Sequence, residues 1–270
     1  MARLTDTHCH LNLNIFQEDF SGFLDRAVQA GVERILVPGI DIATSRTAVA
    51  LAEQHDTLYA AVGVHPGDAS TWEPDTITIL RDLAQHPKVV AIGEIGLDFY
   101  RDRSPRPLQR EIFNAQLALA AELNLPVVVH NRDSFEDLWS ALSAWQSALA
   151  EAGSPLAERP GVLHSFDGTL PTALQAVKQG FFIGISGPVT FKNAQERHET
   201  AAGLPLRQLL IETDAPYLTP QPHRGRWPNE PAYVKFVAEK IASLHNLPVD
   251  TIAQKTWDNA AKLFHWRANS

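Results

Sequence analysis

The chain has 270 residues, of which 44% are apolar and 20% are charged, a composition typical of globular proteins. Its 23 Lys and Arg residues and 31 Asp and Glu residues give a net charge of −8. Proteins that coat nucleic acid present a broad basic surface. The charge balance therefore argues against a sequence-reading DNA-binding module and limits any nucleic-acid contact to a local one.

No apolar run reaches the roughly 18 residues that a membrane-spanning helix needs, and the N-terminus lacks the basic-then-apolar pattern of a signal peptide. The single cysteine, Cys9, cannot form an internal disulfide, which is usual in a reducing compartment. We therefore expect a cytoplasmic protein with no membrane segment and no obligate protein partner.

Eight short runs of β-branched and apolar residues recur along the chain and predict strands. In the segments between them, apolar residues return every three or four positions, as in 107–123 and 169–179, which predicts helices. The connection 132–160 predicts a helix followed by a loop, and helical patterns at 231–246 and 249–265 follow the last strand. The predicted strands cover 4–10, 34–40, 58–65, 89–97, 126–131, 161–166, 181–186 and 209–214.

Strands that alternate with helices favour parallel βαβ units, and eight such units predict an α/β protein with a (β/α)8 TIM-type barrel. An open doubly wound sheet alternates in the same way, but the phosphate-binding pattern GxGxxG is absent after the first strand. We expect residues 1–270 to form a single barrel domain, regular or distorted, with an extra C-terminal helix over 249–265.

Nearly every predicted strand ends in a histidine or a carboxylate. The carboxyl ends of the strands of a TIM barrel share one face, which carries the active site. A cluster of such groups is costly to bury unless it has partners, so the pattern predicts a bound cation. The residues concerned are His8, His10, His65, Glu94, His130, His164 and Asp214.

His8 and His10 are two residues apart, so on an extended strand both side chains lie on the same side. Imidazole nitrogens suit a borderline divalent metal such as zinc. Cys9 faces the other way, and we expect it to be a small buried apolar residue rather than a ligand. Glu94 has two carboxylate oxygens, which makes it the natural bridging ligand between two cations about 3.5–4 Å apart.

His130 and His164 end the fifth and sixth strands and would bind a second cation. Asp214 ends the eighth strand, next to the first in a closed barrel, and suits the cation of the histidine pair. Its carboxylate is also placed to take a proton from an attacking water. Asp214 and Glu94 are therefore the predicted catalytic residues.

Seven segments, in this order along the chain, are DTHCHLN, GVHP, GEIGLDFY, HNRD, HSFDG, ETDAPYLTP and RGRWPNEP. Together they resemble the TatD family of metal-dependent deoxyribonucleases, in the amidohydrolase superfamily. The resemblance implies a nuclease that cleaves DNA or another phosphoester with two divalent cations, either zinc, manganese or magnesium. It assigns as metal ligands His8, His10, Glu94, His130, His164 and Asp214.

Two segments depart from the usual pattern of the family. Trp227 and Pro228 separate the basic and acidic halves of RGRWPNEP. HSFDG has an aspartate before its glycine, where the commoner form of the family has serine or threonine. Neither change touches a predicted ligand, but both lie on the segments expected to face the substrate. The metals of the family therefore transfer to this chain more directly than its DNA substrate does.

Several polar residues are predicted to surround the metals. His65 would bind a substrate oxygen or orient a ligand, while Arg132 would hold a phosphate and Asp133 would steady an imidazole. A basic group on the loop after the eighth strand suits an anionic substrate. The predicted substrate-binding residues are His65, Arg132, His223, Arg224 and Arg226.

Two alternatives remain at this point. An amide or ester hydrolase can use the same kind of site, but many such relatives bridge their metals with a modified lysine, and no lysine lies in a predicted strand. A non-catalytic metal-binding barrel is the other alternative. Structural zinc sites are usually closed by four ligands, whereas six ligands shared by two cations leave positions open for a substrate.

Overall fold

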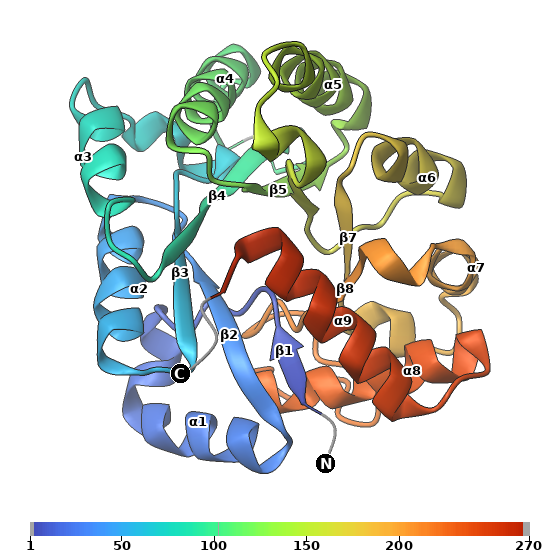
Figure 1. The fold of residues 1–270 in the computed structure, drawn as a ribbon. Coiled ribbons are helices and arrows are strands. Elements are labelled where there is room, and N and C mark those ends of the chain that lie inside the picture. Colours follow the sequence, from blue (N-terminus) through green and yellow to red (C-terminus); the bar gives the residue numbers. More distant parts are fainter. Residues whose placement is uncertain (1–2, 102, 267–270) are drawn as a thin grey trace. The chain divides into compact units, whose positions relative to one another are not determined.

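A computed structural model describes residues 3–101 and 103–266 (Figure 1). Strands and helices alternate along the chain, and the eight parallel strands follow one another in the order β1 to β8. The predicted (β/α)8 TIM-type fold is therefore confirmed. The chain divides into two compact units: the first contains residues 1–37, 165–178 and 182–270, and the second contains 38–164 and 179–181. One domain over residues 1–270 stays a prediction.

The strands of the first unit lie in the order β7, β8, β1 and β2. Parallel pairing joins β1 to β2 and β7 to β8. The Thr7 N–H donates to the carbonyl of Ile211, and Cys9 forms a parallel bridge with Ala215, which places β8 beside the segment that follows β1. The bounds are β1 (Leu4–Asp6), β2 (Val32–Pro38), β7 (Phe182–Ile185) and β8 (Leu209–Ile211).

The helices of the first unit include the predicted extra helix at the C-terminal end, which packs against β1 and β8 (Figure 1). It buries Leu263 and Phe264 in the core. The helices are α1 (Phe20–Gln29), α6 (Leu170–Lys178), α7 (Gln195–Gly203), α8 (Val234–His245) and α9 (Val249–Phe264). Short 3-10 turns are η1 (Asn14–Asp19), η4 (Gly187–Thr190), η5 (Leu206–Gln208) and η6 (Pro231–Tyr233).

The second unit has four strands that pair in parallel in chain order. All ten residues of β4 are buried, so the carboxylates on this strand lie inside the protein. The strands are β3 (Leu58–Val62), β4 (Val89–Asp98), β5 (Val127–Arg132) and β6 (Gly161–Leu163). The helices are α2 (Ile42–Gln54), α3 (Thr76–Leu83), α4 (Arg106–Leu123) and α5 (Phe135–Glu151), with turns η2 (Pro66–Thr71) and η3 (Pro155–Glu158).

Local sequence signals explain where several helices begin and end. Asp41 caps α2 in a capping box with Thr44, which satisfies backbone N–H groups that have no partner within the helix. Helices α4 and α8 end at Asn124 and Asn246, both in the left-handed conformation, a common way to stop a helix.

Four strands end before the site residues that were expected to close them. Strands β1, β3, β6 and β8 end at Asp6, Val62, Leu163 and Ile211, short of the predicted histidines and aspartate. The chain turns sharply after these strands, and Asp214 after β8 has a left-handed φ of 55°. The polar side chains are therefore presented from the turns after the strands rather than from the strands themselves.

Gly96 allows β4 and β5 to approach closely in the second unit. Its φ is +144°, and an added Cβ would collide with the backbone carbonyl of His130. Because only glycine combines this conformation with so close a contact, the sequence GEIGLD brings Glu94 and His130 together on adjacent strands.

Among the described residues, no helix is long and apolar enough to span a membrane.

Candidate metal centre

The six predicted ligands fall into two sets, one in each unit. The first cluster, in the first unit, consists of His8, His10 and Asp214. The two histidine Nε2 atoms lie 3.2 Å apart, and the Asp214 Oδ1 lies 3.8 Å from that of His8 and 3.6 Å from that of His10. Three donor atoms thus meet within the span of one cation's coordination shell. The rings converge as expected from their i, i+2 spacing.

The backbone of Asp214 holds its carboxylate beside the histidines. Its N–H donates to the carbonyl of His8 at 2.9 Å, and its own carbonyl accepts from Tyr217 N–H at 2.8 Å. The left-handed φ of 55° is uncommon for residues other than glycine, but Asp and Asn tolerate it. Cys9 is fully buried, as predicted, and its burial raises the pKa of its thiol.

Asp6 connects the two chain segments of the first cluster. Its carboxylate accepts from His8 N–H at 3.2 Å, from Thr213 N–H at 2.9 Å and from Thr213 Oγ1 at 2.6 Å. Burial raises the pKa of Asp6 to about 8 even though these hydrogen bonds lower it. Asp6 precedes one ligand by two residues, and Thr213 is adjacent to another, so Asp6 is a positioning residue.

We expect Asp6→Ala to destabilise the protein because three buried donors would lose their acceptor. At roughly 1 kcal/mol or more for each donor, the free energy of unfolding should fall by about 3 kcal/mol and the Tm by about 5 °C or more, which thermal unfolding followed by circular dichroism measures. Asp6→Asn is the matched control, since its amide keeps the shape and acceptor oxygen of the protonated acid. Equal Tm values for Asp6→Ala and wild type would contradict this role.

The second cluster, in the second unit, consists of His65, Glu94, His130 and His164. The Glu94 Oε1 lies 2.9 Å from His130 Nδ1, 3.4 Å from His164 Nε2 and 3.7 Å from His65 Nε2. Glu94 is buried. A single carboxylate oxygen therefore sits among three imidazoles, and the donor atoms of Glu94, His130 and His164 lie within 4.8 Å of one another.

Asp98 orients His130 from the other side of the ring. Its Oδ2 lies 3.3 Å from His130 Nε2, while its Oδ1 accepts from the backbone N–H groups of Tyr100 and Arg101 at 3.1 and 2.9 Å. Burial raises the pKa of Asp98, but these hydrogen bonds outweigh burial and hold it well below its usual range. A carboxylate behind a ligating imidazole is a common orienting arrangement.

The electrostatics of the second cluster favour a positive charge. Burial lowers the pKa of His130, yet the hydrogen bonds to Asp98 and Glu94 raise it above its ordinary value. A site that stabilises an imidazolium so far inside the protein also stabilises a cation held by the same atoms. Imidazole nitrogens and carboxylate oxygens are the donors that zinc and manganese accept, so both clusters fit a divalent cation. Bridging by Glu94 joins donors of different units and stays a prediction.

The predicted substrate-binding residues have identifiable partners. His65 lies in the second cluster, and its Nδ1 accepts from Gly67 N–H at 2.9 Å. The Arg132 guanidinium lies 4.6 Å from the ring centre of Tyr100. His223 stacks on Tyr233 with ring centres 4.3 Å apart. Their binding of substrate stays a prediction.

Three predicted residues on the loops after the site strands are exposed. Arg224 and Arg226 are two of them, and the Arg224 guanidinium lies 4.1 Å from the ring centre of Phe191. Asp133, expected to steady an imidazole, is exposed as well, and the carboxylates that contact His130 are those of Glu94 and Asp98. Side-chain alternation along β4 could have identified Asp98 as a site residue, because residues 94 and 98 share a face of a strand.

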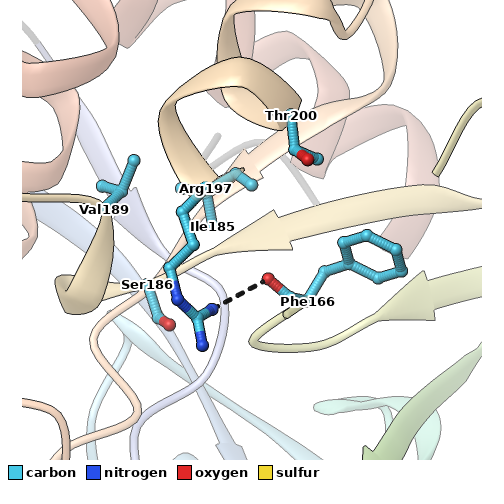
Figure 2. A pocket seen from close by; sticks show the side chains of 6 residues that line it. All are labelled: Phe166, Ile185, Ser186, Val189, Arg197 and Thr200. Carbon is cyan, nitrogen blue, oxygen red and sulfur yellow. Dashed lines mark hydrogen bonds between the residues drawn. The ribbon is translucent and has the colours of Figure 1, made fainter. Parts of the chain in front are cut away.

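A small cavity in the first unit is lined by six residues, none of which belongs to the first cluster (Figure 2). Arg197 reaches over it and donates from Nη1 to the carbonyl of Phe166 at 3.3 Å. The cavity has a volume of about 10 Å³, which is room for about one water molecule. This volume excludes it as a substrate site.

Comparison with known proteins shows the relationship that the site geometry suggests. A family model described as TatD related DNase matches residues 5–265. The chain belongs to the TatD family. TatD proteins are metal-dependent hydrolases, in agreement with the two clusters of metal-binding side chains.

Relatives of this TatD protein match nearly its whole length. It is 43% identical over 261 residues to "Uncharacterized metal-dependent hydrolase YabD" of Bacillus subtilis, covering 97% of this chain and 98% of the relative. It is 40% identical to "3'-5' ssDNA/RNA exonuclease TatD" of Erwinia tasmaniensis, covering 96% and 99%. The crystal structure of YjjV, a TatD homolog from Escherichia coli k12, superposes with a TM-score of 0.89 at 35% identity over 98% of both chains.

Proposed function

We propose that this TatD protein hydrolyses phosphodiester bonds of single-stranded DNA or RNA with one divalent cation in each cluster. The carrying observation is that each cluster places a carboxylate oxygen within 4 Å of at least two imidazole nitrogens inside the protein. The Erwinia tasmaniensis relative named as a 3'-5' ssDNA/RNA exonuclease supports the substrate class.

The residues of the two clusters have distinct roles in this proposal. His8, His10 and Asp214 hold one cation, and Glu94, His130 and His164 hold the other. When bound, such cations lower the pKa of water and neutralise charge on the phosphoryl oxygens. Asp214, whose side chain is 14% exposed, accepts the proton of the attacking water, while Asp98 holds the ring of His130 in place.

The loop after β8 supplies positive charge for the phosphates. Arg224 and Arg226 are exposed there, on either side of Gly225. In a protein with a net charge of −8, such a local basic group attracts the substrate without a broad basic surface. The phosphodiester is therefore recognised by a few local cations rather than by general electrostatic attraction.

Removal and return of metal tests this function. A chelator should reduce hydrolysis of a labelled single-stranded oligonucleotide by at least about 100-fold, because the cations supply the charge stabilisation, and adding zinc, manganese or magnesium should restore it. The measurement is product release resolved by gel electrophoresis, with metal content determined in parallel. DNA, RNA and N-acyl amino acids are compared as substrates.

The controls separate the proposal from its alternatives. Hydrolysis of N-acyl amino acids without cleavage of either nucleic acid would assign an amide hydrolase instead. A metal-loaded protein that is inert towards all three substrates would point to a non-catalytic metal-binding barrel. An oligonucleotide cleavage rate that the chelator leaves unchanged would contradict the metal dependence itself.

A further inference from the structure

Two exposed aromatic rings lie side by side on the loop that follows β8. Trp227 is 60% exposed and Tyr217 is 44% exposed, and their ring centres are 5.8 Å apart with an interplanar angle of 53°. Single apolar side chains on a protein surface are ordinary. Two neighbouring aromatic rings beside a cluster of metal-binding side chains, by contrast, are typical of a surface that binds a flat ligand.

The ring pair is continuous with the first cluster. The Tyr217 ring lies edge-on to the ring of His10, with centres 6.3 Å apart. Its backbone N–H donates to the carbonyl of Asp214 at 2.8 Å. A ligand seated on the pair would therefore have its next chemical group directed at the atoms that this cluster presents.

Buried hydrogen bonds hold the loop in this shape. The side-chain amide of Asn229, which is fully buried, donates to the carbonyls of Thr213 and Tyr217 at 3.0 and 2.6 Å. Thr219 Oγ1 donates to the carbonyl of Arg226 at 2.8 Å. A surface fixed before the ligand arrives loses little conformational entropy on binding, so the rings are preorganised.

Charge and shape together indicate the ligand. Exposed Arg226 precedes Trp227 directly, so the surface combines flat apolar rings with a cation, and a base attached to a phosphate complements both. Stacking of a base on an aromatic ring contributes affinity without sequence preference. Such affinity matters in a protein whose net charge of −8 opposes the approach of a polyanion.

We propose that Trp227 and Tyr217 form a stacking platform in which an unpaired nucleobase lies against the Trp227 ring and the Tyr217 ring, tilted by 53°, borders it. The platform positions the adjoining phosphodiester at the first cluster. The inference rests on the proposed function and adds the residues that select a single strand. A paired base is stacked within its duplex and is not available to the platform. Trp227 is accordingly a specificity residue that binds substrate and takes no part in the proton transfers.

Trp227→Ala tests the platform by binding as well as by kinetics. In the presence of a chelator, where turnover is suppressed, the variant should bind a short single-stranded oligonucleotide about 10-fold more weakly than wild type, the loss expected for one stacked base. Fluorescence anisotropy of a labelled oligonucleotide measures this. Trp227→Phe, which keeps a ring, should restore most of the affinity, and deoxyribose and ribose strands should behave alike.

The matched ligand lacks only the terminal base. An oligonucleotide with an abasic end should bind wild type and Trp227→Ala equally, and with metal present the variant should raise KM while kcat stays near that of wild type. Val28→Ala, which shortens an exposed apolar side chain on α1, should change nothing. Equal binding of the normal strand by wild type and Trp227→Ala, or an equal loss for the abasic strand, would overturn the platform.

These outcomes differ from a failure of the proposed function. Absence of hydrolysis by wild type with every metal would reject the nuclease, whereas the binding measurement needs no turnover. Loss of binding in Trp227→Ala together with an unchanged far-ultraviolet circular dichroism spectrum supports the platform. If the spectrum changes, Trp227→Phe is measured instead. Its affinities for the normal and the abasic oligonucleotide then decide the same question.

Discussion

Asp214→Asn is expected to lower kcat by at least about 1,000-fold while the protein stays folded. The substitution removes the negative charge that lies 3.6 and 3.8 Å from the two imidazoles of the first cluster, and with it the proposed proton acceptor. Loss of a positioned general base alone typically costs 100- to 10,000-fold. Single-turnover hydrolysis of a labelled oligonucleotide measures the loss.

The fold of this variant should survive because asparagine also tolerates the left-handed conformation that residue 214 adopts. Its backbone bonds to His8 and Tyr217 do not involve the side chain. We expect a Tm within a few degrees of wild type. Asp250→Asn, the same change at an exposed position in the first turn of α9, is the matched control and should keep full activity. Retained turnover in Asp214→Asn would remove this residue from the mechanism.

Glu94→Gln is expected to empty the second cluster of its cation. Glu94 is the carboxylate that contacts His65, His130 and His164, and glutamine would leave the neutral ligands without the charge that balances a divalent ion. The apparent metal affinity should fall by more than the 10- to 100-fold seen when an outer partner of a ligand is lost. Metal content per chain after dialysis should fall by one, and kcat should fall with it.

The control for this prediction is Glu122→Gln, because Glu122 carries the same charge in the same unit but pairs with Arg81 on the surface. Surface pairs of this kind contribute little to stability, so metal content and activity should both stay unchanged. A Glu94→Gln protein that retains its full metal content would show that the imidazoles alone suffice. In that case the second cluster would not depend on a carboxylate ligand.

Much of the fold was predictable because its signals are local. Helical periodicity located 107–123 and 169–179 to within a residue or two of α4 and α6. Strand ends were less predictable. Polar residues such as His164 continue an apolar run in the sequence, yet the strand stops at Leu163 because Ser165, two residues later, turns the chain with a φ of 44°.

The residue types of the candidate site were predictable, but the hydrogen bonds that hold those residues in place were not. Side-chain alternation brings Glu94 and Asp98 to one face of β4, yet only the position of His130 reveals that the second carboxylate orients a ring. Asp6 and Asn229 lie in two of the segments that resemble the family, but the sequence did not indicate what they contact. Their hydrogen bonds to Thr213 span 207 and 16 residues of the sequence, and separations of that kind leave no periodic trace in a chain.

The sequence by itself determined the family and the (β/α)8 fold, because composition, periodicity and motif order depend on neighbouring residues. It also supplied the histidines and carboxylates that we propose as metal ligands. Only the tertiary structure decided how these groups are held. The low pKa of Asp98, the buried Asp6 that links His8 to Thr213, and the ring pair of Tyr217 and Trp227 all arise from contacts between segments far apart or turned by loops. Burial and hydrogen bonding act through space, so they appear only when the chain is folded.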